Sequence, residues 1–176
     1  MMRKFKRIDL TNATEDYFLK VGEEAYISFS NVTQVPLHIA TQDGTYYEMH
    51  IIPANTGGTN GGTYAPIYLY PNNTTYSNAF YYTEVIRNYN AMSSFYVQYS
   101  AFRIEYSFSC GTAWITNRTQ YKNVHGIYDT YGLGETYPAL AVFSADWCNT
   151  TTEWTSLGTV VFPQSTSGEI LVRRLK

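Results

Sequence analysis

Apolar and polar residues alternate along most of this chain, which is the pattern of a β-strand with one buried face. Ala25, Ile27 and Phe29, for example, share one side of such a strand, and Tyr26 and Ser28 share the other. The alternation predicts strands over residues 5–10, 17–21, 24–30, 66–70, 79–87, 95–109, 112–116, 138–144, 159–162 and 169–175. Short strands joined by turns rich in Gly, Asn and Thr indicate an all-β domain of the β-sandwich or jelly-roll type.

Residues 35–52 carry the strongest local signal, because two apolar-rich runs flank Asp43-Gly44. A two-residue loop would place Leu37 opposite His50 and mix apolar with polar residues. A three-residue loop with Gly44 at positive φ places Leu37 opposite Met49 and gives one uniformly apolar face. We therefore expect a bulged hairpin in which Leu37 and Met49 face the core.

The polar face of this hairpin carries the only constellation in the sequence that suits metal chemistry. His38 would lie across from Glu48 and diagonal to His50, within reach of one ion. Three ligands on one flat sheet face rarely converge to a tetrahedral site, so we expect no bound metal here. The alternative reading of the three residues is a polar solvent face.

One segment departs from the strand pattern. Its apolar residues recur at intervals of three and four, which is typical of a helix: Tyr121, Val124, Tyr128 and Tyr131. Thr119 or Asn117 is available as an N-cap, although Gly126 is a weak helix former. The sequence predicts one short helix at residues 119–131.

The chain of 176 residues has the size of a single domain, with no internal repeat and no linker. Aromatic residues make up 17% and charged residues only 15%, which argues against disorder. Cys110 and Cys148 either form one disulfide or remain free thiols, and no CxxC motif supports a structural zinc site. There is no apolar run of a signal peptide or a membrane span, so we expect synthesis in a cytoplasm and no membrane contact.

Charge is segregated along the chain. Seven of the 12 basic residues lie at its two ends: Arg3, Lys4, Lys6, Arg7, Arg173, Arg174 and Lys176. Five basic residues therefore stand against all 14 acidic residues in between, a net charge of −9. We expect residues 1–7 to form a basic arm that, with the basic C-terminal end, docks on an acidic partner protein. The alternative is that these charges guard terminal edge strands against aggregation.

The sequence contains no recognisable catalytic motif. There is no Gly-x-Ser-x-Gly elbow, and no Lys follows the glycines of residues 57–62 as a phosphate-binding loop requires. We therefore expect no enzymatic activity, no catalytic residues and no cofactor. Trp114, Trp147 and Trp154 suit either a sugar-stacking platform or the core, and the core is the commoner site for tryptophan.

Three stretches, at residues 71–80, at residues 115–123 and at residues 150–159 running on to 168–175, resemble segments of β-rich structural proteins of tailed bacteriophages. They include Pro-Asn-Asn-Thr-Thr-Tyr-Ser-Asn-Ala-Phe, Ile-Thr-Asn-Arg-Thr-Gln-Tyr-Lys-Asn and Thr-Thr-Thr-Glu-Trp-Thr-Ser-Leu-Gly-Thr. The resemblance implies a virion protein on the outside of the particle, a capsid decoration protein or a fibre component. Its partners would be other virion proteins and copies of itself, without nucleic acid. The alternative function is a receptor-binding module for a host-surface glycan.

Overall fold

The structure, a computed structural model, describes residues 5–53, 67–74, 80–88, 91–99, 102–104, 111–119, 121–129, 140–147 and 152–176. These residues form strands and one short 3₁₀ turn, Pro71–Asn73, so the fold is all-β as predicted. The strands are β1 (Lys6–Asp9), β2 (Glu23–Pro36), β3 (Thr45–Pro53), β4 (Ile67–Tyr70), β5 (Phe80–Asn88), β6 (Ala91–Tyr99), β7 (Phe102–Ile104), β8 (Gly111–Arg118), β9 (Tyr121–Asp129), β10 (Leu140–Trp147) and β11 (Thr159–Arg174).

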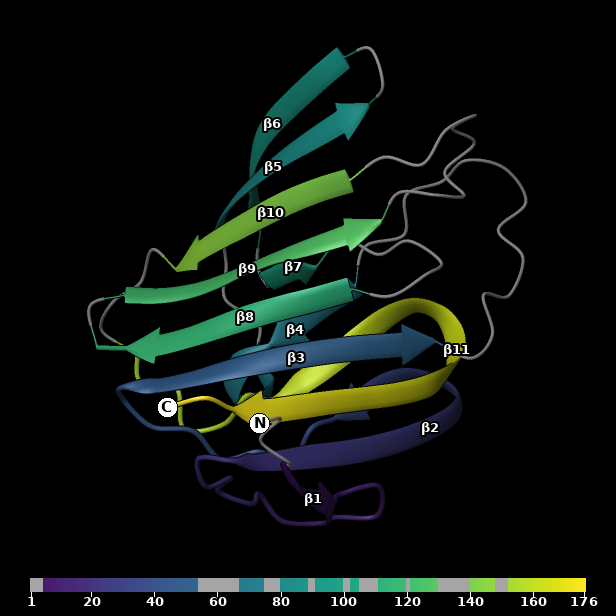
Figure 1. Ribbon diagram of the computed structural model, residues 1–176, viewed down its shortest axis with the longest axis vertical. Helices are drawn as coiled ribbons and strands as arrows, with labels where there is room; N and C mark the ends of the chain where they lie inside the picture. The colour runs from purple at the N-terminus through teal and green to yellow at the C-terminus, as the bar shows by residue number, and fades with distance from the viewer. Residues whose placement is uncertain are drawn as a thin grey trace.

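The described strands belong to one curled sheet with the order β1-β2-β11-β3-β8-β9-β10-β5-β6. β1 and β2 are parallel, and the other described pairs are antiparallel. β4 pairs with both β11 and β7, off the main path. Because the sheet curls, β4, β7 and the first part of β11 lie behind β3, β8 and β9 (Figure 1). The jelly-roll topology remains a prediction.

The long ribbon of β2 and β11 makes the curl possible. Its register shifts between Val161 and Thr166, and Asn31 on β2 has φ 55°, so the pairing is irregular there. The Asn31 N–H donates to Ser167 Oγ at 2.8 Å, and Ser165 Oγ donates to Asn31 Oδ1 at 2.7 Å. A bulge of this kind increases the local twist of the strands. The curled sheet forms two layers, and β2 and β11 each bend at the bulge and contribute to both of them. The predicted break after residue 30 is therefore a bend inside one strand.

The core lies between the two layers. Its apolar side chains come from both of them and include Leu37, Ile39, Tyr47, Met49, Leu69, Ile115, Phe143, Trp154 and Val160. Trp147 and Trp154 pack edge to face with ring centroids 5.4 Å apart, a favoured aromatic geometry. These two tryptophans are buried, so they belong to the core rather than to a sugar platform.

The predicted hairpin of residues 35–52 is wrong about which strands pair, but it is right about which residues face the core. β11 lies between β2 and β3, so Val35 pairs with Val160 and Met49 pairs with Val172. Leu37 and Met49 are buried, and Gly44 has φ +83°, as the bulged register requires. The chain does turn at Gly44, but a strand from the far C-terminus replaces the local partner. No pattern among neighbouring residues could have predicted the insertion of β11 between β2 and β3.

The predicted helix at residues 119–131 is also wrong, because this segment contains β9. β9 is paired along its length with β8 on one side and with β10 on the other. Val124 and Gly126 face the core, and a Cβ on Gly126 would meet the Phe143 ring at 2.6 Å. The glycine that weakens a helix thus makes room for an aromatic ring over the strand. Pairing on both edges outweighs the local helical spacing.

Candidate functional site

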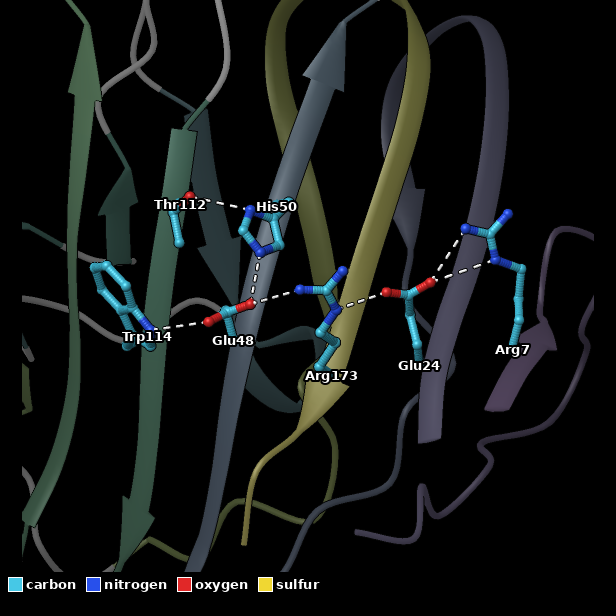
Figure 2. Close-up of polar contacts among 7 residues, drawn as sticks. All are labelled: Arg7, Glu24, Glu48, His50, Thr112, Trp114 and Arg173. Atoms are coloured by element: carbon cyan, nitrogen blue, oxygen red, sulfur yellow. Dashed lines mark hydrogen bonds and ion pairs between the residues drawn. The ribbon is translucent and has the colours of Figure 1, made fainter. Parts of the chain in front are cut away.

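The outer face of the sheet, opposite the core, carries a continuous row of polar side chains. The strand registers place Arg7, Glu24, Arg173, Glu48 and Trp114 side by side on β1, β2, β11, β3 and β8. His50 and Thr112 lie next to this row on β3 and β8. We term these seven residues the polar ladder (Figure 2).

Glu24 holds one half of the ladder. Its carboxylate is buried and accepts hydrogen bonds from Arg7 Nη2 at 3.2 Å and Arg7 Nε at 3.3 Å. Its other oxygen accepts from Arg173 Nε at 2.6 Å. The hydrogen bond to Glu24 raises the pKa of Arg173 above its ordinary value, and the opposing effect of burial is outweighed. A buried carboxylate is stable here because two guanidinium groups neutralise it.

Glu48 holds the other half. It accepts hydrogen bonds from Arg173 Nη1 at 3.1 Å, His50 Nε2 at 2.7 Å and Trp114 Nε1 at 3.3 Å. Burial acts to raise the pKa of Glu48, but the hydrogen bonds and charges of His50 and Arg173 outweigh it. The pKa therefore lies below its ordinary value, and the ionised carboxylate is the favoured form.

The ladder continues onto β9 and β10 through His125. Its ring stacks on Trp114 with centroids 5.6 Å apart, and its Nδ1 donates to Asn123 Oδ1 at 2.8 Å. Asn123 Nδ2 in turn donates to Asp146 Oδ1 at 2.7 Å. Burial lowers the pKa of His125, so its neutral form is favoured. Polar contacts and one stacked ring pair therefore tie together seven neighbouring strands across one face.

Three ladder residues stand in the order of a nucleophile, base and carboxylate. Thr112 Oγ1 lies 3.0 Å from His50 Nδ1, and His50 Nε2 lies 2.7 Å from Glu48. Acyl transfer also needs N–H donors at the developing oxyanion. β8 pairs along its length with β3 and β9, so its backbone N–H groups serve the sheet. The geometry suits a fixed polar network better than a nucleophile.

The predicted metal constellation does not form. β2 and β3 are not neighbours, and His38, at φ 51°, instead has its Nδ1 3.6 Å from Asp16. Glu48 and His50 do lie together, as predicted, but their further partners are Arg173 and Thr112. Within the residues that the structure describes, no group of three His, Cys, Asp or Glu side chains could hold a metal ion.

The predicted basic arm is wrong for Lys6 and Arg7, which lie in β1 instead of extending from the domain. Lys6 Nζ is 3.5 Å from Glu23, and Arg7 binds Glu24. These pairings hold β1 against the edge of β2. Arg3, Lys4, Cys110 and Cys148 lie outside the described residues.

The basic C-terminal end is also engaged with its own domain. Arg174 Nη1 donates to the backbone oxygen of Leu19 at 2.8 Å and covers the Phe18 ring at 4.4 Å. The Lys176 backbone oxygen accepts from Tyr46 N–H at 3.2 Å. Docking of these ends on a partner stays a prediction, and Arg173 already serves the ladder.

A shallow groove of about 450 Å³ lies at one end of the outer face. Its lining consists of Gly44, Thr45, Tyr46, Thr116, Arg118, Tyr121, Leu175 and Lys176. Tyr121 is 53% exposed. Its partial burial, followed by the charges of Asp146 and Tyr46, raises the pKa of Tyr121 above its ordinary value. Aromatic rings beside cationic groups suit a polar ligand with an apolar face.

Sequence reasoning missed Glu24, Arg173, Thr112 and Trp114 as members of one network. Glu24 does occupy a polar position in an alternating strand, which was the only local signal. Their meeting depends on β11 lying between β2 and β3, a pairing that spans 149 residues between Glu24 and Arg173.

No helix of the described residues is long and apolar enough to cross a membrane. The chain matches no protein family model, no curated protein and no solved structure.

Proposed function

We propose that this chain is a non-enzymatic structural protein on the outside of a tailed-bacteriophage particle, a capsid decoration protein or a fibre component, that works by protein–protein assembly. The outer face of the sheet is the observation that carries the proposal. Its polar groups bond to one another, so they do not need to be desolvated unpaired when a partner covers them. The resemblance of three stretches of the sequence to phage virion proteins supports the choice of a phage particle.

Exposed apolar side chains lie on the same face, next to the ladder. Ile127 on β9 and Val142 on β10 are 38% and 49% exposed, and they are direct cross-strand neighbours. Apolar residues surrounded by satisfied polar groups are the usual anatomy of a protein interface. Stacking of Trp114 on His125 and the cross-strand hydrogen bonds keep the face rigid, which lowers the entropic cost of docking.

The test uses particles from cells that carry the phage genome encoding this chain. We expect purified particles to contain the protein in many copies, accessible to antibody on their surface. Val142→Lys should lower its incorporation at least about tenfold, because a charge would be buried in the contact. Val21→Lys is the matched control, since Val21 is 59% exposed and lies in the turn before β2. Particles without the protein, or equal incorporation of both variants, would contradict the proposal.

The same proposal assigns Thr112, His50 and Glu48 a structural role. Thr112→Val should therefore leave the hydrolysis of p-nitrophenyl acetate at the level of a matched surface variant such as Thr116→Val. A burst of acyl-enzyme that disappears only in Thr112→Val would reveal a nucleophile and make the chain an enzyme.

The groove at the end of the outer face supports a second candidate function, the binding of a host-surface glycan. Tyr46 and Tyr121 offer ring faces for sugar stacking, and Arg118 lines the same groove. This chemistry favours a saccharide that carries a carboxylate. Oligogalacturonate should bind more tightly than the neutral oligogalactose, and Tyr121→Ala should weaken binding about tenfold. Tyr26→Ala, on the far side of the face, is the control, and equal binding of all variants would contradict a glycan site here.

A further inference from the structure

The two ends of the main sheet path differ in how well they are protected. β1 forms one end and β6 forms the other, as Figure 1 shows. An edge strand exposes a row of backbone N–H and C=O groups that can pair with another chain. Natural sheets protect such edges by short strands, by charged residues or by proline.

The β1 edge has this protection. The strand is four residues long, and Lys6, Arg7 and Asp9 are charged. Their exposed side chains would be desolvated if another strand paired with β1.

The β6 edge has none of these devices. β6 is nine residues long, Ala-Met-Ser-Ser-Phe-Tyr-Val-Gln-Tyr, with no charged residue and no proline. It pairs with β5 along its whole length, from Asn88↔Ala91 to Phe80↔Tyr99. Among the strands that the structure describes, none pairs with its other edge. Phe, Tyr and Val are residues of high strand propensity, so β6 offers a long and regular template.

We propose that β6 is a self-association edge, which pairs in antiparallel fashion with β6 of a second copy of this chain. A second copy fits because the strand is neutral, so two identical edges meet without like-charge repulsion. A charged partner strand would find no opposite charge on β6. Antiparallel pairing about a two-fold axis uses the same edge on both copies, so it closes as a dimer rather than growing into a fibre. The two sheets would then be continuous.

This inference concerns a different surface from the outer face, so it goes beyond the proposed function and is tested separately. In an antiparallel strand, successive residues direct their N–H groups alternately to the two neighbouring positions. Ser93 and Ser94 are adjacent in the middle of β6, so one of the two donates outward. Proline at that position removes the N–H that points away from β5 and leaves the pairing with β5 intact.

Sedimentation equilibrium and thermal melting of the full chain test the proposal. We expect the wild type to be dimeric at micromolar concentration. One of Ser93→Pro and Ser94→Pro should weaken the dimer at least about tenfold without lowering the melting temperature. Ser94→Lys is a second variant that keeps the strand intact. Residue 94 is in register with Val85 of β5 and, through it, with Val142 of β10, and two lysines at this position should weaken the dimer by like-charge repulsion that salt relieves. Ser28→Lys on β2 is its matched control and should remain dimeric.

A wild type that stays monomeric up to about 100 μM would overturn the proposal. So would a dimer that both proline variants and Ser94→Lys leave unchanged. A dimer that dissociates only in Val142→Lys would assign self-association to the outer face instead. Failure of particle incorporation with an intact β6 dimer would count against the proposed function alone.

Discussion

Replacing Gly158 with alanine is expected to lower the free energy of unfolding by about 3–5 kcal/mol. Gly158 has φ +78°, and a Cβ there would overlap the backbone carbonyl oxygen of Tyr70 and lie 3.0 Å from Asn73 N. The neighbouring groups are backbone and cannot rotate away. Leu37 N–H donates to the Gly158 carbonyl at 2.9 Å, so the segment cannot shift without losing a core contact.

Gly44→Ala is the matched control for this prediction. Gly44 has a similar φ of +83°, but a Cβ there meets nothing within 4 Å. Its replacement should cost only the left-handed strain, about 1–2 kcal/mol. The difference between the two variants, measured by urea unfolding with equal m-values, isolates the close approach of the chain at Tyr70. Equal losses in the free energy of unfolding for the two variants would mean that the backbone near Tyr70 moves to make room for the added methyl group.

The class of the fold was predictable because the alternation of apolar and polar residues records which face of each strand is buried. The same alternation correctly divided Leu37 and Met49 from Glu48 and His50. It could not name the partner of a strand, since burial of one face is compatible with many neighbours. The insertion of β11 between β2 and β3 is a long-range event, and the hairpin prediction failed for this reason.

The helix prediction failed for a related reason. Tyr121, Val124 and Tyr128 have helical spacing, but a strand with neighbours on both edges gains hydrogen bonds that outweigh a local preference. The apolar pattern of β9 is also irregular, because Lys122 is buried on the same face as Val124. Burial lowers the pKa of Lys122, and its Nζ lies 3.5 Å from the Thr119 carbonyl. In the alternation of apolar and polar positions, a lysine on the core side of a strand is mistaken for a solvent-facing residue.

The candidate site was predictable only in part. Glu48 and His50 are two apart on one strand, so their proximity follows from strand geometry alone. Glu24 and Arg173 each occupy a polar position, but nothing local joins them. The basic residues at the chain ends invited an interpretation as free docking groups, whereas Arg7 and Arg173 neutralise a buried carboxylate. For these two arginines, the position of the charge in the sequence reflects an internal ion-pair network.

Replacing Arg173 with methionine is expected to destabilise the protein by about 2–3 kcal/mol at neutral pH. The change removes the guanidinium between Glu24 and Glu48 and leaves one buried and one half-buried carboxylate short of a partner. Loss of one partner from a fully buried pair costs about 3–5 kcal/mol, and we expect less here because the Arg173 side chain is 31% exposed. Methionine keeps the apolar stem, so packing changes little.

Arg174→Met is the matched control, because Arg174 is the next residue of β11 and its guanidinium donates to the backbone oxygens of Leu19 and Lys176. It should cost less than half as much, about 1 kcal/mol. The loss in Arg173→Met should also depend on pH through Glu48. The folded pKa of Glu48 is lowered from an ordinary value of 4.5, so its stabilising contribution is present above that pH and is lost as the pH falls through the lowered pKa. The gap between wild type and Arg173→Met in urea unfolding should therefore be widest near pH 7 and narrow below pH 4.5. A gap that stays constant with pH would mean that Arg173 stabilises the sheet through packing, with no part for the charge of Glu48.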